Sequence, residues 1–136
     1  MEKPICRDPI FLSRKSVPAV SSDGGVGQDL LDTLNAHREH CVGMAANMIG
    51  RAKRAIVVDD GGKPLLMYNP ELLKASGEYE AEEGCLSLPG TRKTKRYRSI
   101  KVRYQNDKFE TRIKTFQGFT AQIIQHEMDH LEGKLI

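Results

Sequence analysis

The sequence predicts an α+β fold in which a mixed, mostly antiparallel sheet packs around a C-terminal helix, with another helix nearer the N-terminus. Short apolar or alternating segments at 55–58, 65–68, 100–104 and 109–116 predict the strands. In two longer segments, one in the first third of the chain and one at its end, apolar residues recur at helical spacing. A chain of 136 residues suits one domain, which we expect to span residues 1–136.

The N-terminal helix is predicted from about Gln28 to His40. Its leucines form one apolar stripe, and acidic residues fall in its first turns, where the helix dipole favours them. Turn-forming pairs that contain Pro or Gly predict irregular structure over the first 27 residues. His37 and His40 lie three residues apart near the end of this helix. They lack a Glu or Cys neighbour at metal spacing, so we expect them to be surface histidines.

The strands are predicted in sequence order. The run 55–58 indicates a buried strand, and Asp59-Asp60-Gly61-Gly62 predicts a turn into a second strand, Leu65 to Tyr68. Asn69-Pro70 is expected to end that strand, and the polar stretch 71–82 to be extended. Residues 100–104 and 109–116 alternate, so we expect a hairpin whose loop is 105–108.

The last helix is predicted from about Phe119 to Glu132, between Gly118 and Gly133. It carries the sequence His126-Glu127-Met128-Asp129-His130, an HExxH motif. Residues four apart share a helix face, so both imidazoles can bind one cation while Glu127 reaches a water molecule beside it. This pattern predicts metal-assisted hydrolysis.

A thiol from mid-sequence supplies a third candidate ligand. Cys85 lies in Glu83-Gly84-Cys85-Leu86-Ser87, and thiolates bind the transition metals that imidazole also favours. Two His and one Cys leave one position of a tetrahedral site for a water molecule. The ligand set permits Fe²⁺, Zn²⁺, Ni²⁺ or Co²⁺, whereas Mg²⁺ and Ca²⁺ prefer oxygen ligands.

Together, the Glu-Gly-Cys-Leu-Ser and Gln-His-Glu-x-x-Asp-His segments resemble those of peptide deformylases, and the resemblance covers roughly residues 4–136. It implies removal of the N-formyl group from the initiator methionine of newly made proteins, with release of formate. It also implies one metal ion, Fe²⁺ in the cell and often Zn²⁺, Ni²⁺ or Co²⁺ after purification. The implied ligands are Cys85, His126 and His130, with Glu127 as the proton carrier and the Leu86 backbone N–H as an oxyanion donor.

A third family segment, Gly-x-Gly-hydrophobic-Ala-Ala-x-Gln, is matched only in part, by residues 41–48. Cys41 replaces the first glycine, and Met48 replaces a glutamine that, in the family, helps to hold the formyl oxygen. A thioether has no N–H to donate, so activity is expected to be reduced. Asn47, the neighbouring residue, carries a carboxamide, and one hypothesis is that it substitutes for the glutamine after a small backbone shift. By the same resemblance, Gly43 lies beside the peptide backbone, and Ile123 is a candidate wall of the methionine pocket.

Three charged residues lie in or near these motifs: Glu83, Arg96 and Asp129. Glu83 and Arg96 are either supports behind the metal ligands or surface charges, and the sequence favours neither interpretation. Asp129 faces away from the histidines on a helical wheel, which favours a structural salt bridge over metal ligation.

Composition narrows the function classes. The chain is 39% hydrophobic and 29% charged with a net charge of +3, and its longest apolar runs are a few residues. We therefore expect no membrane span and no specific DNA binding. The start lacks the apolar core of a signal peptide, and three cysteines do not suggest a disulfide framework, so a cytoplasmic location is expected.

A basic cluster follows the cysteine motif. It could make a weak contact with the ribosome, although the solvated face of a strand is the simpler interpretation. The cluster consists of Arg92, Lys93, Lys95, Arg96 and Arg98.

The expected partners are N-formylmethionyl peptides and nascent chains. A catalytically weak, metal-bearing module that binds such peptides is a second hypothesis, supported by Met48. An HExxH metalloprotease is a third, but such enzymes usually take a further ligand downstream. Only six residues follow His130, and none is His, Asp or Cys.

Overall fold

The computed structural model describes residues 1–85 and 87–134. Its centre is a five-stranded antiparallel sheet in the order β1-β2-β3-β4-β5. The strands are β1 (Gly43–Ala45), β2 (Ala55–Asp60), β3 (Lys63–Cys85), β4 (Leu88–Gln105) and β5 (Thr111–Gln117). The α+β fold predicted from the sequence is confirmed. All strand pairings described are antiparallel rather than mixed, and one isolated bridge, Val17 to Lys53, is parallel.

Strand β2 is the buried centre of the fold. Residues 55–58 are fully buried, as their continuous apolar run predicts for a strand covered on both faces. The predicted turn also forms, because β2 ends at Asp60 and β3 begins at Lys63. Gly61 and Gly62 have φ values of +60° and +94°, the left-handed conformation that a two-residue hairpin requires.

The prediction that Asn69-Pro70 ends the second strand is wrong. Asn69 and Pro70 together oppose the single residue Tyr104, because the register shifts between Tyr68 and Glu71. Such a bulge suits a proline, which has no N–H to give to the ladder. Asn69 adopts φ +51°, and its carboxamide bonds to both backbone groups of Ala19 at 2.7 and 2.9 Å. The chain therefore bends here and continues as strand through the polar stretch 71–82.

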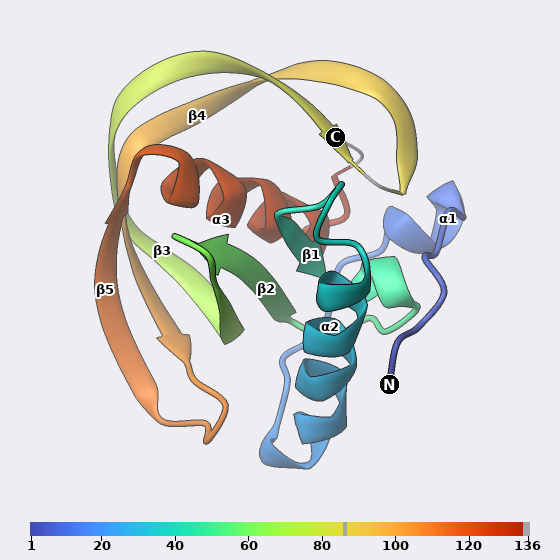
Figure 1. The fold of residues 1–136 in the computed structure, drawn as a ribbon. Coiled ribbons are helices and arrows are strands. Elements are labelled where there is room, and N and C mark those ends of the chain that lie inside the picture. Colours follow the sequence, from blue (N-terminus) through green and yellow to red (C-terminus); the bar gives the residue numbers. More distant parts are fainter. Residues whose placement is uncertain (86, 135–136) are drawn as a thin grey trace.

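Strands β3 and β4 form a long curved hairpin that arches over the C-terminal helix (Figure 1). A second register shift, between Leu72 and Lys74, lies along the same hairpin. The next hairpin, formed by β4 and β5, lies close to its predicted position, although β5 begins at Thr111 rather than at residue 109. This curvature returns the end of β3 to the middle of the molecule, above the helix.

The N-terminal half contains two helices, α1 (Pro9–Leu12) and α2 (Gly24–Ala36), and two short 3-10 turns, η1 (Ser21–Asp23) and η2 (Ala46–Ile49). Helix α2 begins four residues before the predicted start and ends four residues before the predicted end. Gly24 and Gly25 therefore begin the helix instead of preventing it. The prediction of an irregular N-terminus also missed α1, where the Asp8 carboxylate accepts a hydrogen bond from the N–H of Ile10 at 3.0 Å.

Helix α3 (Gly118–Leu131) lies within one residue of its predicted bounds. Gly118 and Gly133 have φ values of +64° and +78°, and the Gly133 N–H donates to the carbonyl of His130 at 3.0 Å. The helix packs against β1, β2 and β4 beneath the hairpin arch (Figure 1). Ile124 and Leu131 are fully buried on this side, and Met128 is partly buried beside them. Among the described helices, none is both long and apolar enough to cross a membrane.

Gly27 on α2 provides a test of core packing. A Cβ there would lie 2.0 Å from the Tyr68 hydroxyl, and Tyr68 cannot move away because it is buried and stacked on Phe109 at 4.3 Å. We expect Gly27→Ala to lower the free energy of unfolding by about 1–3 kcal/mol. The measurement is urea denaturation. Gly25→Ala, on the same helix and facing open space, is the matched control and should raise that free energy by about 0.5–1 kcal/mol.

Candidate metal centre

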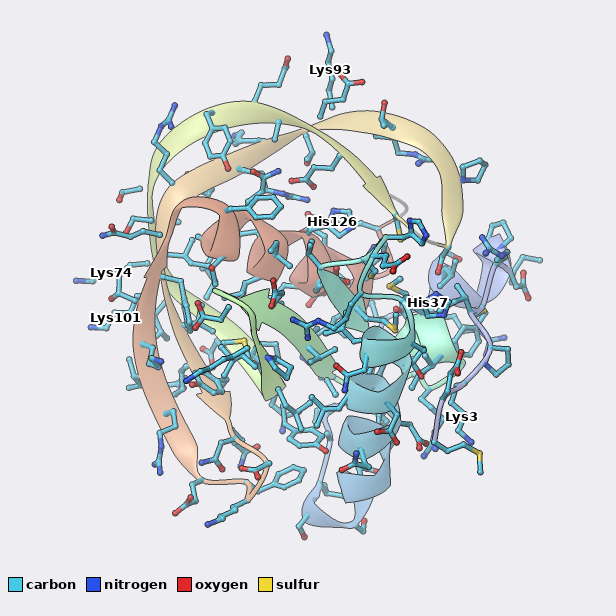
Figure 2. The ribbon with its side chains drawn as sticks, in the orientation of Figure 1. Lys3, His37, Lys74, Lys93, Lys101 and His126 are labelled. Atoms are coloured by element: carbon cyan, nitrogen blue, oxygen red, sulfur yellow. The ribbon has the colours of Figure 1, made fainter. Side chains whose placement is uncertain are left out.

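Three potential ligands converge where the end of β3 meets α3. The Sγ atom of Cys85 and the ring nitrogens of His126 and His130 all lie within 4.8 Å of one another. The histidines are one helical turn apart, and their Nε2 atoms approach to 3.1 Å. Both rings are buried beneath the β3–β4 arch, where Figure 2 places His126. The predicted ligand set is therefore assembled by two segments forty residues apart in sequence.

The pKa values of the two imidazoles shift in opposite directions. Burial opposes a charge on His126, but the hydrogen bonds that its ring donates to the Cys85 sulfur and to Glu83 outweigh burial and raise the pKa of His126 to about 10. Burial, together with the charge on His126, lowers the pKa of His130 to about 3. Two Nε2 atoms at 3.1 Å can share only one proton. A divalent cation between the same atoms would take the place of that proton.

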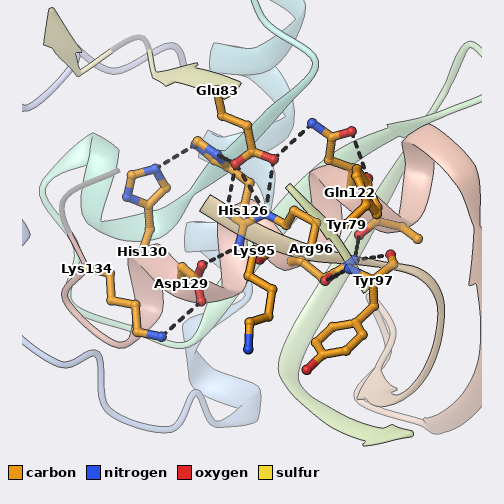
Figure 3. A network of polar contacts seen from close by, with 12 residues as sticks. Tyr79, Glu83, Lys95, Arg96, Tyr97, Gln122, His126, Asp129, His130 and Lys134 are labelled. Carbon is orange, nitrogen blue, oxygen red and sulfur yellow. Dashed lines mark hydrogen bonds and ion pairs between the residues drawn. The ribbon is translucent and has the colours of Figure 1, made fainter. Parts of the chain in front are cut away.

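Behind His126 lies a buried ion-pair network (Figure 3). Glu83 accepts a hydrogen bond from His126 Nδ1 at 2.8 Å, which directs Nε2 toward Cys85 and His130. Arg96 donates to both Glu83 oxygens, at 2.7 and 3.0 Å, and to Asp129 at 2.7 Å. Burial opposes ionisation of Glu83, yet its bonds to His126 and Arg96 lower its pKa to about 2.

This network decides between the two interpretations of Glu83 and Arg96. They are 7% and 3% exposed, so they are not surface charges, and Glu83 bonds directly to the candidate ligand His126. Asp129 forms the predicted salt bridge, with Arg96 as its partner.

Glu127 stands beside the ligands and against β1. It is buried, and its Oε1 atom has no hydrogen-bond partner among the described residues. Burial raises the pKa of Glu127 to about 7. A Cβ on Gly43 would lie 2.9 Å from Glu127 Oε2 and 2.6 Å from the Ile123 side chain. Only glycine leaves room for the carboxylate at this contact between β1 and α3.

A cavity of about 240 Å³ opens onto these groups. Its walls include Gly43, Met48 and Ile123 among the residues predicted from sequence, together with the metal-site residues Cys85, His126 and Glu127. The other lining residues are His40, Cys41, Val42, Glu82, Glu83, Gly84, Phe119 and Gln122. A partly apolar cavity with a few polar groups at its base is typical of a site for a small ligand or a peptide side chain.

Comparisons with known proteins agree with this arrangement. The polypeptide deformylase family model matches residues 6–136. The chain belongs to the peptide deformylase family. A peptide deformylase of Clostridium beijerinckii is 54% identical over 100% of both chains. One from Thermotoga neapolitana is 46% identical over 95% of this chain and 80% of its own length.

Solved structures of peptide deformylases share the fold. The structure from Thermotoga maritima covers 99% of this chain and 95% of its own, with a TM-score of 0.89 and 32% identity. A structure from Acinetobacter baumannii bound to Met-Ala-Ser covers 99% of this chain and 97% of its own, with a TM-score of 0.88 and 30% identity.

Within this deformylase fold, Met48 and Asn47 lie in different surroundings. Met48 is buried and lines the cavity, and its sulfur lies 3.4 Å from the N–H of Ala45. The Asn47 carboxamide donates to the carbonyl of His130 at 2.8 Å, and Asn47 does not line the cavity. The hypothesis that Asn47 replaces the family glutamine therefore has no geometric support. Its contact instead fixes the last turn of α3, which carries the candidate ligand His130.

The predicted oxyanion donor, the N–H of Leu86, lies outside the described residues. Its neighbour Ser87 is described, and the Ser87 N–H donates to Cys85 Sγ at 3.4 Å. A bond of this kind stabilises a thiolate, the form of cysteine that binds metals.

The basic cluster 92–98 of this deformylase is largely matched by acidic residues across the hairpin. Glu82 pairs with Lys93 and Glu80 with Lys95 in the strand register, while Lys95 also contacts Glu78 at 3.7 Å. Lys93 projects outward from the arch (Figure 2). Arg96 is buried, so it does not belong to this surface at all.

Sequence reasoning missed several residues of the site. Cys41, noted in the sequence only as the replacement of a family glycine, lines the cavity, and its thiol donates to the carbonyl of Gly43 at 2.8 Å. Phe119 and Gln122, on the first turns of α3, also line it. The signal available was helical spacing, because Phe119, Gln122 and His126 recur at intervals of three and four.

Asn47→Ala tests the structural role of the amide. The substitution removes the side-chain donor of the His130 carbonyl, which keeps the Gly133 N–H, so we expect the free energy of unfolding to fall by about 0.5–1.5 kcal/mol. Urea denaturation measures this change, and formate release per folded protein should be retained. A stable variant with abolished turnover would instead favour Asn47 as the formyl-oxygen donor.

Proposed function

We propose that the chain hydrolyses the N-formyl group of peptides that begin with formylmethionine, and releases formate and a free α-amine. The observation that carries the proposal is the group of half-buried Cys85 and buried His126 and His130, with Glu127 beside it at the base of a cavity. Family membership supports the same reaction. N-formylated nascent chains are accordingly the proposed substrates.

The residues present fit one divalent transition metal. The two Nε2 atoms face each other, and the Cys85 sulfur lies close by. The nitrogens are borderline donors and the sulfur is a soft donor, and one small cation could bind all three atoms at this spacing. Such an ion, when bound, supplies Lewis-acid activation of water near neutral pH. We propose Fe²⁺ as the metal in the cell, from the family resemblance, and the donor set equally accepts Zn²⁺, Ni²⁺ or Co²⁺.

Glu127 is the proposed proton carrier. Its Oε1 atom has no partner in the described part of the chain and is free to accept a proton from the attacking water. The water oxygen bonds to the formyl carbon, the C–N bond breaks, and Glu127 delivers the proton to the departing amine. The same carboxylate thus serves first as base and then as acid.

The methionine side chain is proposed to occupy the cavity. Ile123 and Met48 offer apolar contacts, and Gly43 lets the peptide backbone approach β1. Met48 cannot donate a hydrogen bond to the formyl oxygen. We propose that the backbone N–H of Leu86 donates to the formyl oxygen instead.

The metalloprotease alternative lacks support, because the third potential ligand comes from β3 rather than from a residue downstream of the motif. A metal-bearing peptide-binding module remains the second candidate, favoured by Met48. We propose a cytoplasmic location, where nascent chains are made. A ribosome contact through the basic cluster is expected to be weak and salt-sensitive, since acidic residues across the hairpin offset its charge.

Glu127→Gln tests the proton carrier and the function together. We expect formate release from formyl-Met-Ala-Ser to fall by about 10²–10⁴-fold, because the amide cannot carry the proton. Bound metal, measured on anaerobically prepared protein, should be retained. Glu132→Gln is the matched control at the C-cap of the same helix, exposed and paired with Arg54, and should keep its turnover. Wild-type protein that binds the peptide without releasing formate would establish the binding module instead.

Met48→Gln tests the missing donor. Losing one oxyanion donor costs about 10²–10³-fold in rate, so restoring an N–H at this position should raise kcat/KM at least about tenfold. Metal content should not change, because Met48 is not a ligand. Steady-state kinetics on formyl-Met-Ala-Ser measure the effect. An unchanged or lower kcat/KM in a folded, metal-loaded variant would show that this chain has dispensed with the donor.

A further inference from the structure

We propose that Gln122, held in place by Tyr79, is a positioning residue of the metal centre: it fixes the Glu83 carboxylate and, through it, the ring of His126. The inference rests on the proposed function only in requiring that the site binds a metal. It assigns a role to Gln122 and Tyr79, for which the sequence predicted no function.

The contacts form a continuous chain from the hairpin to the metal ligand (Figure 3). The Tyr79 hydroxyl donates to Gln122 Oε1 at 3.0 Å, and Gln122 Nε2 donates to Glu83 Oε2 at 2.9 Å. Glu83 Oε1 then accepts from His126 Nδ1 at 2.8 Å. Gln122 and His126 lie four residues apart on α3, so they share the helix face that meets Glu83.

The donor and acceptor inventory fixes the direction of this chain. An ionised carboxylate only accepts hydrogen bonds, so Gln122 must present its NH₂ group to Glu83. Its carbonyl oxygen must then face the other way, toward a donor, and the Tyr79 hydroxyl is that donor. Tyr79 therefore selects the amide orientation that Glu83 requires.

Gln122 completes the support of one Glu83 oxygen. Oε1 receives hydrogen bonds from His126 and Arg96, whereas Oε2 receives them from Arg96 and Gln122 among the described residues. With both oxygens held, the carboxylate cannot rotate, and the bond to Nδ1 keeps the His126 ring aimed at the other ligands.

Tyr79 is itself held. The Arg98 guanidinium lies over its ring, 4.9 Å from the centroid. This contact gives one member of the basic cluster a defined structural partner. Tyr79 lies on β3 and Arg98 on β4, so the chain of contacts ends on the two strands of the hairpin.

The proposal predicts weaker metal binding when the amide is removed. Residues that hydrogen-bond directly to metal ligands typically contribute 10–100-fold in affinity, and Gln122 lies one bond further out, so we expect about 3- to 10-fold for Gln122→Met. Tyr79→Phe, which removes one oxygen atom only, should weaken binding by about two- to threefold on the same reasoning. In the double variant, Tyr79→Phe should add nothing, because it acts through Gln122.

The experiment measures the dissociation constant for Co²⁺ by competition with a chromogenic chelator. The absorption spectrum of the Co²⁺ form reports the ligand geometry, and thermal unfolding of the metal-free proteins reports the fold. Gln125→Met is the matched control. It makes the same change on the same helix, but Gln125 bonds to the backbone of Tyr97 and not to Glu83. It should lower thermal stability and leave Co²⁺ affinity and spectrum unchanged.

Three results would overturn the proposal: Co²⁺ affinity and spectrum of Gln122→Met equal to wild type, full additivity in the double variant, or an equal loss of affinity in Gln125→Met. Should Gln122→Met fail to fold, Tyr79→Phe alone decides, because unchanged affinity and spectrum would also overturn it. Formate release does not enter this test. A chain that binds Co²⁺ as predicted but releases no formate would refute the proposed function and leave this inference standing.

Discussion

The contact on which the rest of the structure depends is the buried carboxylate of Glu83. An isolated charge in the protein interior is costly, so Glu83 requires partners on every side. His126 on α3, Arg96 on β4 and Gln122 on α3 provide them. Satisfying this one group forces the end of β3, the middle of β4 and the face of α3 to meet. The long hairpin must therefore arch over the helix, as Figure 1 shows.

The position of Cys85 follows from the same contact. Side chains two apart in a strand point to the same face, so a strand that directs Glu83 toward α3 directs Cys85 there as well. Glu82, the residue before Glu83, is exposed, as this alternation predicts. The helix contributes its own periodicity, which places Gln122, His126 and His130 on one face. Side chains repeat every two residues in the strand and about every 3.6 residues in the helix. These two local patterns bring the three candidate ligand atoms within 4.8 Å of one another.

The sequence predicted best where the pattern was local. The bounds of α3 and the Gly61-Gly62 turn follow from glycine conformation, and the buried β2 follows from its apolar run. It failed at Asn69-Pro70, because a bulge stabilised by the distant Ala19 backbone lets the strand continue past a proline. The role of Gln122 was invisible for a similar reason. Its partners Tyr79 and Glu83 lie about forty residues away, and only the folded hairpin brings them to it.

The buried state of Glu127 bears on whether the chain is an enzyme or only a binding module. A buried carboxylate oxygen without a hydrogen-bond partner in the described structure costs free energy, and a neutral or apolar side chain there would avoid the cost. Metal binding would give no reason to keep it, since the proposed ligand atoms come from Cys85, His126 and His130. Gly43 also leaves space for this carboxylate at the contact with β1. A group retained at such cost beside the metal ligands is explained by proton transfer, which favours catalysis despite the methionine at position 48.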